Sequence, residues 1–144
     1  MFRTKRNFQS SRRAGGFTLI EMLLVLVIIV ILASIAVPSY LKYEATAKKN
    51  AAVAQIAAFK QALEAYAVNN NGEYPTTAEG LDALIHNPGS VPNWTKTLDT
   101  TSIPPDPWGT PYKYQCPSDN PDKDYDIISA GPDKVMGTAD DISN

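Results

Sequence analysis

The sequence predicts an α+β fold, in which one long N-terminal helix, membrane-spanning in its first half, packs on a small antiparallel sheet. Two observations carry this prediction. Residues 17–37 form an apolar run with one formal charge, and at about 1.5 Å per residue a helix of this length spans roughly 32 Å, enough to cross a bilayer core. The chain after residue 72 contains two short stretches with the alternating pattern of strands, separated by turn residues.

The charges are divided unevenly along the chain, and this division predicts its orientation. The net charge is −2, but the first 16 residues carry five Lys and Arg residues and no acid, so the remainder carries −7. A basic N-terminus is retained in the cytoplasm, and we expect the domain after the apolar run to cross the membrane. The acidic remainder has no basic patch, which argues against a nucleic-acid partner.

Glu21 lies only five residues into the apolar run. Because an ionised carboxylate in hydrocarbon is costly, we expect Glu21 to have a functional role. The small residues Ala14, Gly15 and Gly16 precede the apolar run, whereas a secretory signal has its small-residue cleavage site after it. A cut before Phe17 would remove the leader 1–16 and leave the helix attached. An uncleaved single-span anchor is the alternative.

The stretch GGFTLIEMLLVLVIIVILASIAVPSY resembles the signal of type IV pilins and pseudopilins. The resemblance implies that a prepilin peptidase cleaves between Gly16 and Phe17 and methylates the new amine of Phe17. It also implies that Glu21 meets the N-terminal amine of a neighbouring subunit and sets the register of a helical filament. Pairing of Glu21 with the amine of its own chain is the alternative.

The helix is predicted to continue beyond the membrane span, from about Phe17 to about Asn70, with a bend near Pro38. Residues 38–71 are rich in helix formers, and the helix is expected to stop at Asn69-Asn70-Asn71-Gly72. Apolar side chains recur there at spacings of three and four, which indicates one buried stripe. The stripe consists of Val53, Ile56, Phe59, Leu63 and Tyr66.

Residues 72–144 are predicted to form a globular head. Thr76 and Glu79 fit a capping box at the start of a short helix, which carries Leu81, Leu84 and Ile85 and ends at Asn87-Pro88-Gly89. Residues 90–103 are expected to form a loop that Trp94 pins to the core. Strands are expected at Tyr112–Cys116 and Tyr125–Ser129, paired antiparallel across an eight-residue turn.

The only cysteine and the only histidine carry little chemistry. Cys116 is alone, so no internal disulfide can form, and a lone cysteine usually acts as a small core residue. His86 follows the short helix without an identifiable catalytic partner in the sequence. We therefore expect no enzyme, and no catalytic residue is assigned.

Acidic residues gather at the C-terminal end. Asp133, Asp140 and Asp141 lie among Gly131 and Gly137, and carboxylate oxygens on a glycine-bearing loop suit Ca²⁺, although the spacing is not that of an EF-hand. A solvated acidic tail is the alternative.

The segments YPTTAEGLDALI, DPWGTPYKY and YDIISAGPDKVMGTADDI look like the globular domain of the major pseudopilins of type II secretion systems. The resemblance implies a pilin-like fold with a structural Ca²⁺ in the C-terminal loop. Its ligands would be the carboxylate of Asp133, the carboxylate of Asp140 or Asp141 or both, and the carbonyls of Ala130 and Val135. Such a metal clip would take the place of a disulfide.

The same resemblance implies a structural subunit of the type II secretion pseudopilus, which polymerises from the inner membrane to help drive export of folded proteins through the outer membrane. It would be a single-pass inner-membrane protein with its C-terminal domain in the periplasm. Its partners would be copies of itself, minor pseudopilins, the inner-membrane assembly platform and prepilin peptidase. The alternatives are a type IV pilin of an adhesion, motility or DNA-uptake filament and a monomeric membrane-tethered Ca²⁺-binding module.

Overall fold

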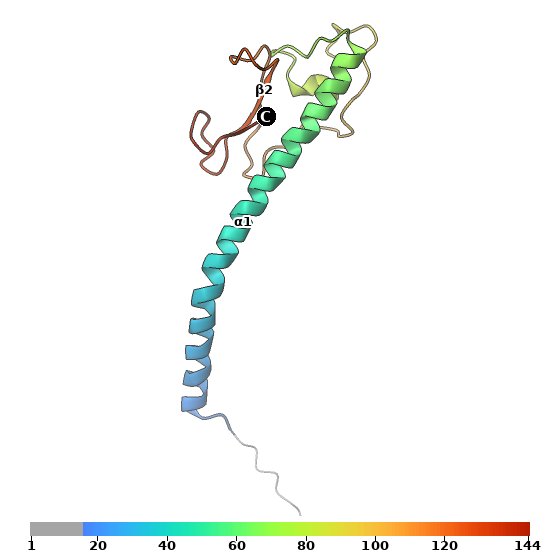
Figure 1. Cartoon of the computed structure of the whole chain (residues 1–144). Coiled ribbons are helices and arrows are strands. Elements are labelled where there is room, and N and C mark those ends of the chain that lie inside the picture. Colours follow the sequence, from blue (N-terminus) through green and yellow to red (C-terminus); the bar gives the residue numbers. More distant parts are fainter. Residues whose placement is uncertain (1–15) are drawn as a thin grey trace, which may run out of the picture. The chain divides into compact units, whose positions relative to one another are not determined.

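The computed structural model describes residues 16–144, and the predicted basic leader lies outside these residues except for Gly16. The elements follow in the order α1, Leu19–Asn69; η1, a 3₁₀ helix at Leu81–Leu84; and three strands, β1, Lys113–Gln115, β2, Asp126–Ser129, and β3, Ile142–Ser143 (Figure 1). The chain divides into two compact units, one ending at Leu41 and one from Lys42 to Asn144.

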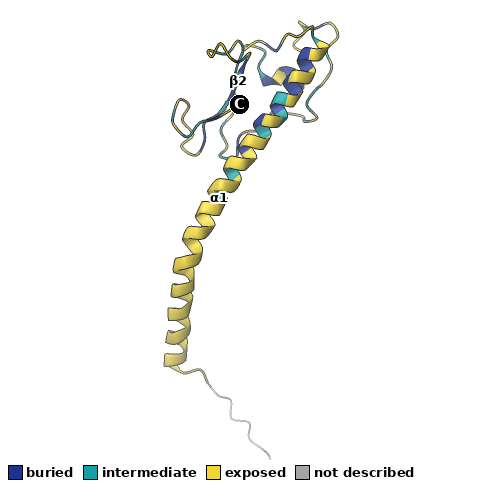
Figure 2. Cartoon of the chain, in the orientation of Figure 1, coloured by how far each residue is buried: buried dark blue, intermediate teal, exposed yellow. Residues whose placement is uncertain are grey.

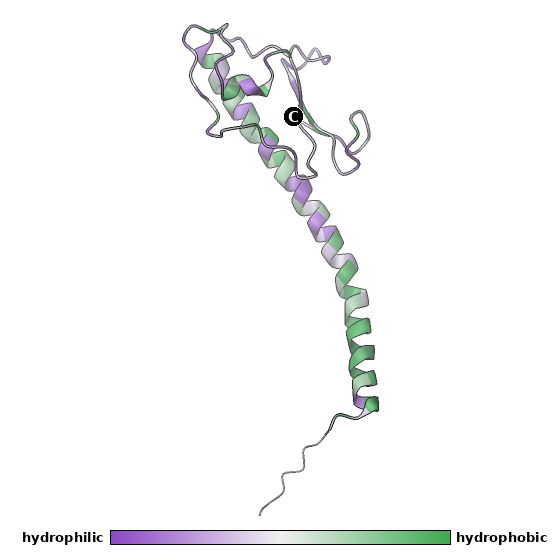
Figure 3. Cartoon of the chain, turned by 180° about the vertical axis from the view of Figure 1, so that it is seen from behind, coloured by the Kyte–Doolittle hydropathy of each residue, from purple (hydrophilic) through white to green (hydrophobic). Residues whose placement is uncertain are grey.

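The first unit is the apolar start of α1. Its side chains are exposed throughout, and the hydrophobic residues follow one another along this part of the helix (Figure 3). Among the described residues, α1 is the helix that is long and apolar enough to cross a membrane. As predicted, α1 continues without interruption past Pro38. The hydroxyls of Ser34 and Ser39 donate to the carbonyls of Ile31 and Ile35, at 2.7 and 3.2 Å.

The second unit begins with the amphipathic part of α1. Buried residues lie along one face of this part of the helix (Figure 2), and they are Ala52, Ile56, Phe59, Ala62, Leu63, Tyr66 and Ala67. Four of the five predicted stripe residues belong to this set.

The prediction was wrong for Val53, which is 50% exposed, while the neighbouring Ala52 is fully buried. At 3.6 residues per turn, Val53 lies about 120° around the helix from Phe59, and Ala52 lies about 20° from it. A spacing of three from Ile56 was therefore insufficient to place Val53 on the buried face.

The capping box forms, but it does not start an α-helix. The backbone N–H of Thr76 donates to Glu79 Oε2 at 2.8 Å, and the N–H of Glu79 donates to Thr76 Oγ1 at 3.3 Å. These contacts close a turn, after which Gly80 has φ 64° and interrupts helical geometry. The predicted short helix is consequently reduced to the 3₁₀ helix η1, and Ile85 is its C-terminal cap.

The loop after η1 is attached to the core as expected. The N–H of Gly89 donates to Asn87 Oδ1 at 2.8 Å and closes a turn. Trp94 is half-buried, and its Nε1–H donates to the carbonyl of Ala83 at 2.7 Å. Cys116 is partly buried against the core, which is consistent with its expected packing role.

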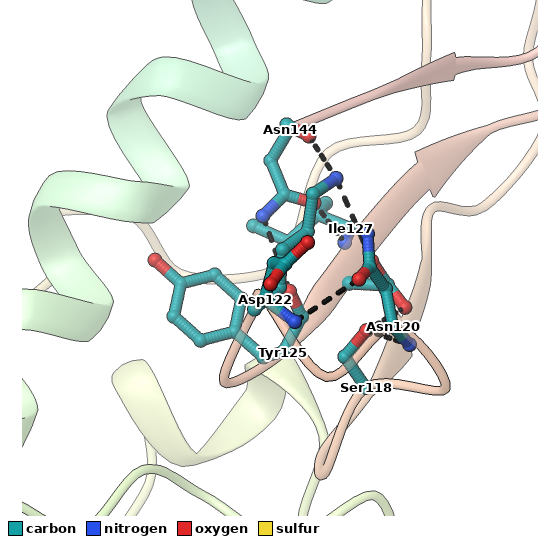
Figure 4. Close-up of polar contacts among 8 residues, drawn as sticks. Ser118, Asn120, Asp122, Tyr125, Ile127 and Asn144 are labelled. Carbon is teal, nitrogen blue, oxygen red and sulfur yellow. Dashed lines mark hydrogen bonds and ion pairs between the residues drawn. The ribbon is translucent and has the colours of Figure 1, made fainter.

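The three strands form one antiparallel sheet in the order β1-β2-β3. Tyr114 pairs with Ile127 across β1 and β2, and Ser129 pairs with Ile142 across β2 and β3. The first two strands were predicted, each slightly longer than observed, whereas β3 was not. The C-terminal Asn144 extends this pairing, because its Oδ1 accepts from the N–H of Ile127 at 2.9 Å (Figure 4).

The core of the head lies between α1, η1 and the inward side chains of the sheet. Phe59, Leu63, Leu84 and Ile127 are its largest fully buried apolar side chains apart from a proline. Phe59 meets the ring of Tyr112 edge to face, with 5.1 Å between ring centroids.

Candidate functional site

The start of α1 is closed by a second capping box, which involves the predicted assembly residue. The N–H of Glu21 donates to Thr18 Oγ1 at 3.2 Å, and the N–H of Thr18 lies 3.5 Å from Glu21 Oε2. A carboxylate here also faces the positive end of the helix dipole. The sequence analysis missed this arrangement, although the pattern Thr-x-x-Glu at 18–21 is the one recognised at 76–79.

The predicted cleavage site lies just outside the helix. Gly16 and Phe17 are exposed and precede the first helical residue, Leu19. A Cβ added at Gly16 would meet no atom within 4 Å. The peptide bond between Gly16 and Phe17 is therefore sterically accessible in this chain.

The C-terminal loop between β2 and β3 holds the three predicted carboxylate ligands, and each is turned back into the loop. Asp133 Oδ1 accepts from the N–H of Val135 at 2.9 Å. Asp140 Oδ2 accepts from the N–H of Asp133 at 3.2 Å, and Asp141 Oδ2 accepts from the N–H of Gly137 at 2.7 Å. The loop is thus ordered by its own carboxylates.

The hydroxyl of Thr138, which the sequence analysis did not select, is surrounded by oxygen atoms of this loop. Thr138 Oγ1 lies 2.6 Å from Asp140 Oδ1, 3.2 Å from the carbonyl oxygen of Val135 and 3.5 Å from Asp141 Oδ1. The Thr138 hydrogen bond is the main cause that lowers the pKa of the Asp140 carboxyl from its ordinary value. A hydroxyl carries one hydrogen, so it can satisfy only one of these three acceptors at a time.

The chemistry of this set fits a hard cation. Carboxylate, carbonyl and hydroxyl oxygens are the ligands of Ca²⁺, and a cation could interact with all the acceptors that one hydrogen cannot satisfy. In residues 16–144, however, no group of three or more His, Cys, Asp or Glu side chains is placed to hold a metal ion. The loop therefore brings together two carboxylates, Asp140 and Asp141, with the Val135 carbonyl, while Asp133 is bonded to the backbone nearby.

The two ends of the loop meet at Gly131. Ala130 is fully buried, and Gly131 has φ 66°, a conformation that favours glycine. A Cβ at Gly131 would collide with the carbonyl oxygen of Asp140. Glycine at this position therefore allows the close approach that joins the start of the loop to its end.

A buried carboxylate outside the loop was also missed by the sequence analysis. Asp106 is 3% exposed. Its Oδ1 accepts from the N–H groups of Trp108 and Thr110, at 3.1 and 2.7 Å, and its Oδ2 accepts from the hydroxyl of Ser129 at 2.7 Å. The sequence DPWGT shows the turn, but Ser129 is 23 residues away, so the local pattern contains no signal for this contact.

The geometry around His86 resembles no catalytic arrangement. His86 Nδ1 lies 3.8 Å from Asp82 Oδ2, and both side chains are largely exposed. This is the geometry of a surface contact between side chains four residues apart.

A helix that is apolar at its start and amphipathic at its end, followed by a small sheet and preceded by a Gly-Phe-x-x-x-Glu signal, defines the class of pilin-like filament subunits. Residues 39–144 match the family model described as type II secretion system (T2SS), protein G, and residues 11–37 match the prokaryotic N-terminal methylation motif. The chain belongs to the type II secretion system protein G family.

Relatives support this assignment over nearly the whole length. The chain is 42% identical over 139 residues to the type II secretion system core protein G of Escherichia coli K12, with 94% of each chain covered. It is 42% identical to the protein of the same name from Aeromonas hydrophila over 136 residues, covering 92% of this chain and 93% of the relative.

A solved structure agrees with the fold. The crystal structure of the major pseudopilin from the type 2 secretion system of enterohaemorrhagic E. coli matches with a TM-score of 0.60 and 34% identity, covering 72% of this chain and 91% of the other. The predicted family and fold class are confirmed, and the chain is a structural pseudopilin rather than an enzyme.

Proposed function

We propose that this chain is processed at Gly16, anchored in the inner membrane and polymerised into the type II secretion pseudopilus through its N-terminal helix. The observation that carries the proposal is the exposed apolar start of α1, which follows an accessible Gly16-Phe17 bond in a chain of this family. The export of folded proteins through the outer membrane is the task of the assembled filament.

Processing supplies a charge where the helix begins. Cleavage before Phe17 produces an ammonium group four residues from Glu21. Thr18 and Glu21 already cap the helix, which orders the carboxylate at its N-terminus. The carboxylate of one subunit can then pair with the amine of the next, and the pair is far less costly in an apolar core than either charge alone.

Orientation follows from the charges beside the span. Five basic residues precede Phe17, so we infer that the N-terminus faces the cytoplasm and the head lies in the periplasm. There the head would meet copies of itself and minor pseudopilins, while the start of α1 would meet prepilin peptidase and the assembly platform. Protease added to the outside of spheroplasts should digest the head of the membrane-inserted chain. A head that is protected until the membrane is dissolved contradicts this orientation.

The substitution Glu21→Gln tests the assembly step. Glutamine can occupy the same place in a capping box, so the variant should keep its helix while losing the negative charge. We expect pseudopilus formation to fall at least tenfold, measured as sheared filament protein under overexpression. Glu44→Gln is the matched control, since Glu44 also lies on α1 and forms a surface pair with Lys48 at 2.9 Å. Normal filaments from Glu21→Gln would refute the assembly role.

We also propose that the C-terminal loop binds a structural Ca²⁺ through Asp133 and through Asp140 or Asp141 or both, with the carbonyls of Ala130 and Val135 as further oxygen ligands. The convergence of three oxygen acceptors on one hydroxyl supports this proposal. When bound, the ion would supply positive charge to an acidic loop and stabilise the folded head, because it binds the folded state alone.

Thermal unfolding of the full-length chain in detergent tests the cation. At a Ca²⁺ concentration of about 100 times Kd, binding adds about 2.7 kcal/mol, which corresponds to a rise in Tm of roughly ten degrees for a domain of this size. Mg²⁺ serves as the control, because its small octahedral shell suits such a loop poorly. Asp133→Ala should abolish the rise. An equal Tm in Ca²⁺ and in chelator would show that the loop binds no structural Ca²⁺ and that its carboxylates are only solvated.

A further inference from the structure

The turn at residues 106–110 lies in contact with the base of the C-terminal loop. Asp106 accepts the Ser129 hydroxyl, and the oxygen of that hydroxyl in turn accepts the N–H of Gly131 at 3.3 Å. Trp108 lines a cavity of about 380 Å³ together with Pro132, Asp140 and Asp141. The turn therefore reaches both ends of the loop.

We propose that Asp106 and Ser129 are positioning residues for the cation loop, which fix the backbone at Gly131 so that the oxygen ligands hold their places before the ion arrives. This inference rests on the proposed Ca²⁺ binding and names residues that do not touch the ion. Partners of this kind orient the ligands of a metal and change its affinity without coordinating it.

The direction of the hydrogen bonds explains why a carboxylate occupies position 106. A carboxylate only accepts, so the Ser129 hydroxyl must point its hydrogen toward Asp106 Oδ2. A lone pair of Ser129 Oγ then faces the N–H of Gly131. Both oxygens of Asp106 are engaged, and both Asp106 and Ser129 are almost fully buried, so solvent does not compete for these bonds.

The constraint passes from Gly131 to the ligands by contact. Gly131 is held in a left-handed conformation, and a Cβ added to it would collide with the backbone carbonyl of Asp140. The N–H of Lys134 donates to the carbonyl of Gly131 at 3.3 Å, which shapes the turn that carries Asp133. A change at Ser129 therefore moves the start of the loop and its end together.

The chain offers a matched control at the far end of the sheet. Ser118 Oγ donates to Asp126 Oδ2 at 2.6 Å. It also accepts from the N–H of Asn120 at 2.9 Å (Figure 4). This is the same pair of bonds that Ser129 makes, to a carboxylate and to the N–H two residues on, but in the turn between β1 and β2. Removing either hydroxyl should weaken its own turn, and only one of the two turns carries the cation loop.

The experiment is calorimetric titration of Ca²⁺ into the full-length chain in detergent, for the wild type, Ser129→Ala and Ser118→Ala. We expect Ser129→Ala to raise the Kd for Ca²⁺ by about tenfold or more, and Ser118→Ala to leave it within twofold. Near-UV circular dichroism without Ca²⁺ checks that the heads are folded. If Ser129→Ala does not fold, the isosteric variant Asp106→Asn is titrated in its place. Its amide N–H would donate to Ser129 Oγ, so the Ser129 hydroxyl could no longer donate to residue 106. We expect the Kd for Ca²⁺ to rise several-fold in this variant.

Each result decides the proposal. A Kd of the folded Ser129→Ala or Asp106→Asn variant within twofold of the wild type overturns the positioning role while leaving the cation site intact. An equal loss in Ser118→Ala and Ser129→Ala also overturns it, because general loosening of the head would then explain both. Absence of Ca²⁺ binding by the wild type overturns the cation site and, with it, the positioning role.

Discussion

Substitution of Phe59 and Val53 by alanine distinguishes the face of α1 that packs in the head from the face that stays free. Phe59 is fully buried and meets Tyr112 edge to face, whereas Val53, six residues earlier on the same helix, is 50% exposed. Both positions belong to the apolar stripe suggested by the sequence, so their different burial is a finding of the structure.

The expected losses differ severalfold. Replacing a buried Phe by Ala costs about 3–5 kcal/mol, including the cavity that remains, and the contact with Tyr112 accounts for roughly 1 kcal/mol of that. At about 4 °C per kcal/mol for a domain near 100 residues, the Tm of Phe59→Ala should fall by roughly 12–20 °C. Val53→Ala removes two methyl groups that are half in water, so its loss should stay below about 1 kcal/mol.

The assay is thermal unfolding of the full-length chain in detergent, followed by near-UV circular dichroism of the aromatic residues in the head. Dissociated chains are required, since a neighbouring subunit in a filament could cover Val53. Similar losses for the two variants, or a larger loss for Val53→Ala, would show that the helix packs on the face predicted from the sequence spacing and would refute the arrangement described here.

Three further predictions concern single contacts of the head. Tyr114→Phe removes a buried hydrogen bond of 2.8 Å to the carbonyl of Pro75 and should lower the free energy of unfolding by about 1–3 kcal/mol in urea titrations; no change would mean that water replaces the bond. Gly131→Ala should destabilise the head by at least about 1–2 kcal/mol in the same titrations, because φ is positive there and the new Cβ meets Asp140; wild-type stability would disprove the close approach. The pKa of the Glu79 carboxyl is lowered by hydrogen bonds, chiefly from the hydroxyl of Ser90. The ionised carboxylate therefore contributes fully to stability at a pH above its unfolded-state pKa of about 4.3, and this contribution is lost as the pH falls through the lower folded-state pKa. Unfolding measured between pH 6 and about pH 3 should therefore show a steeper loss in the wild type than in Glu79→Gln, and parallel curves would contradict the lowered pKa.

The parts of the fold that sequence analysis predicted are those with local causes. The long helix, predicted from about Phe17 to about Asn70 and observed at Leu19–Asn69, follows from residues close together in the chain. The same holds for the capping box at Thr76 and Glu79 and for the strands β1 and β2, which were predicted slightly longer than observed. The strand β3 has two residues and exists only because it pairs with β2, so its own sequence contains too little pattern to reveal it.

The site was predictable to a smaller extent. The residues of the C-terminal loop were selected by their oxygen chemistry, but their convergence on Thr138 depends on backbone turns that composition does not specify. Asp106 was not selected from the sequence, because its bond to Ser129 is a long-range contact that only the folded chain produces. The missing information was the local backbone conformation around Thr138 and, for Asp106, the residue distant in the sequence that it meets.

The polar groups at the start of α1 explain how one helix can serve in lipid and in a filament. The hydroxyls of Ser34 and Ser39 bond to carbonyls of the preceding turn, and Thr18 bonds to the N–H of Glu21. A polar group that is satisfied within its own helix costs little in hydrocarbon, so these residues can pass from lipid to contact with other helices without losing a partner. The charge of Glu21 remains incompletely compensated by its own chain, because the N–H of Thr18, 3.5 Å from Glu21 Oε2, does not neutralise a carboxylate at a helix end. In the proposed filament, transfer into an apolar core would favour the arrangement in which the ammonium of a neighbouring subunit meets Glu21. This one charge would then select the register of an otherwise uniform apolar surface.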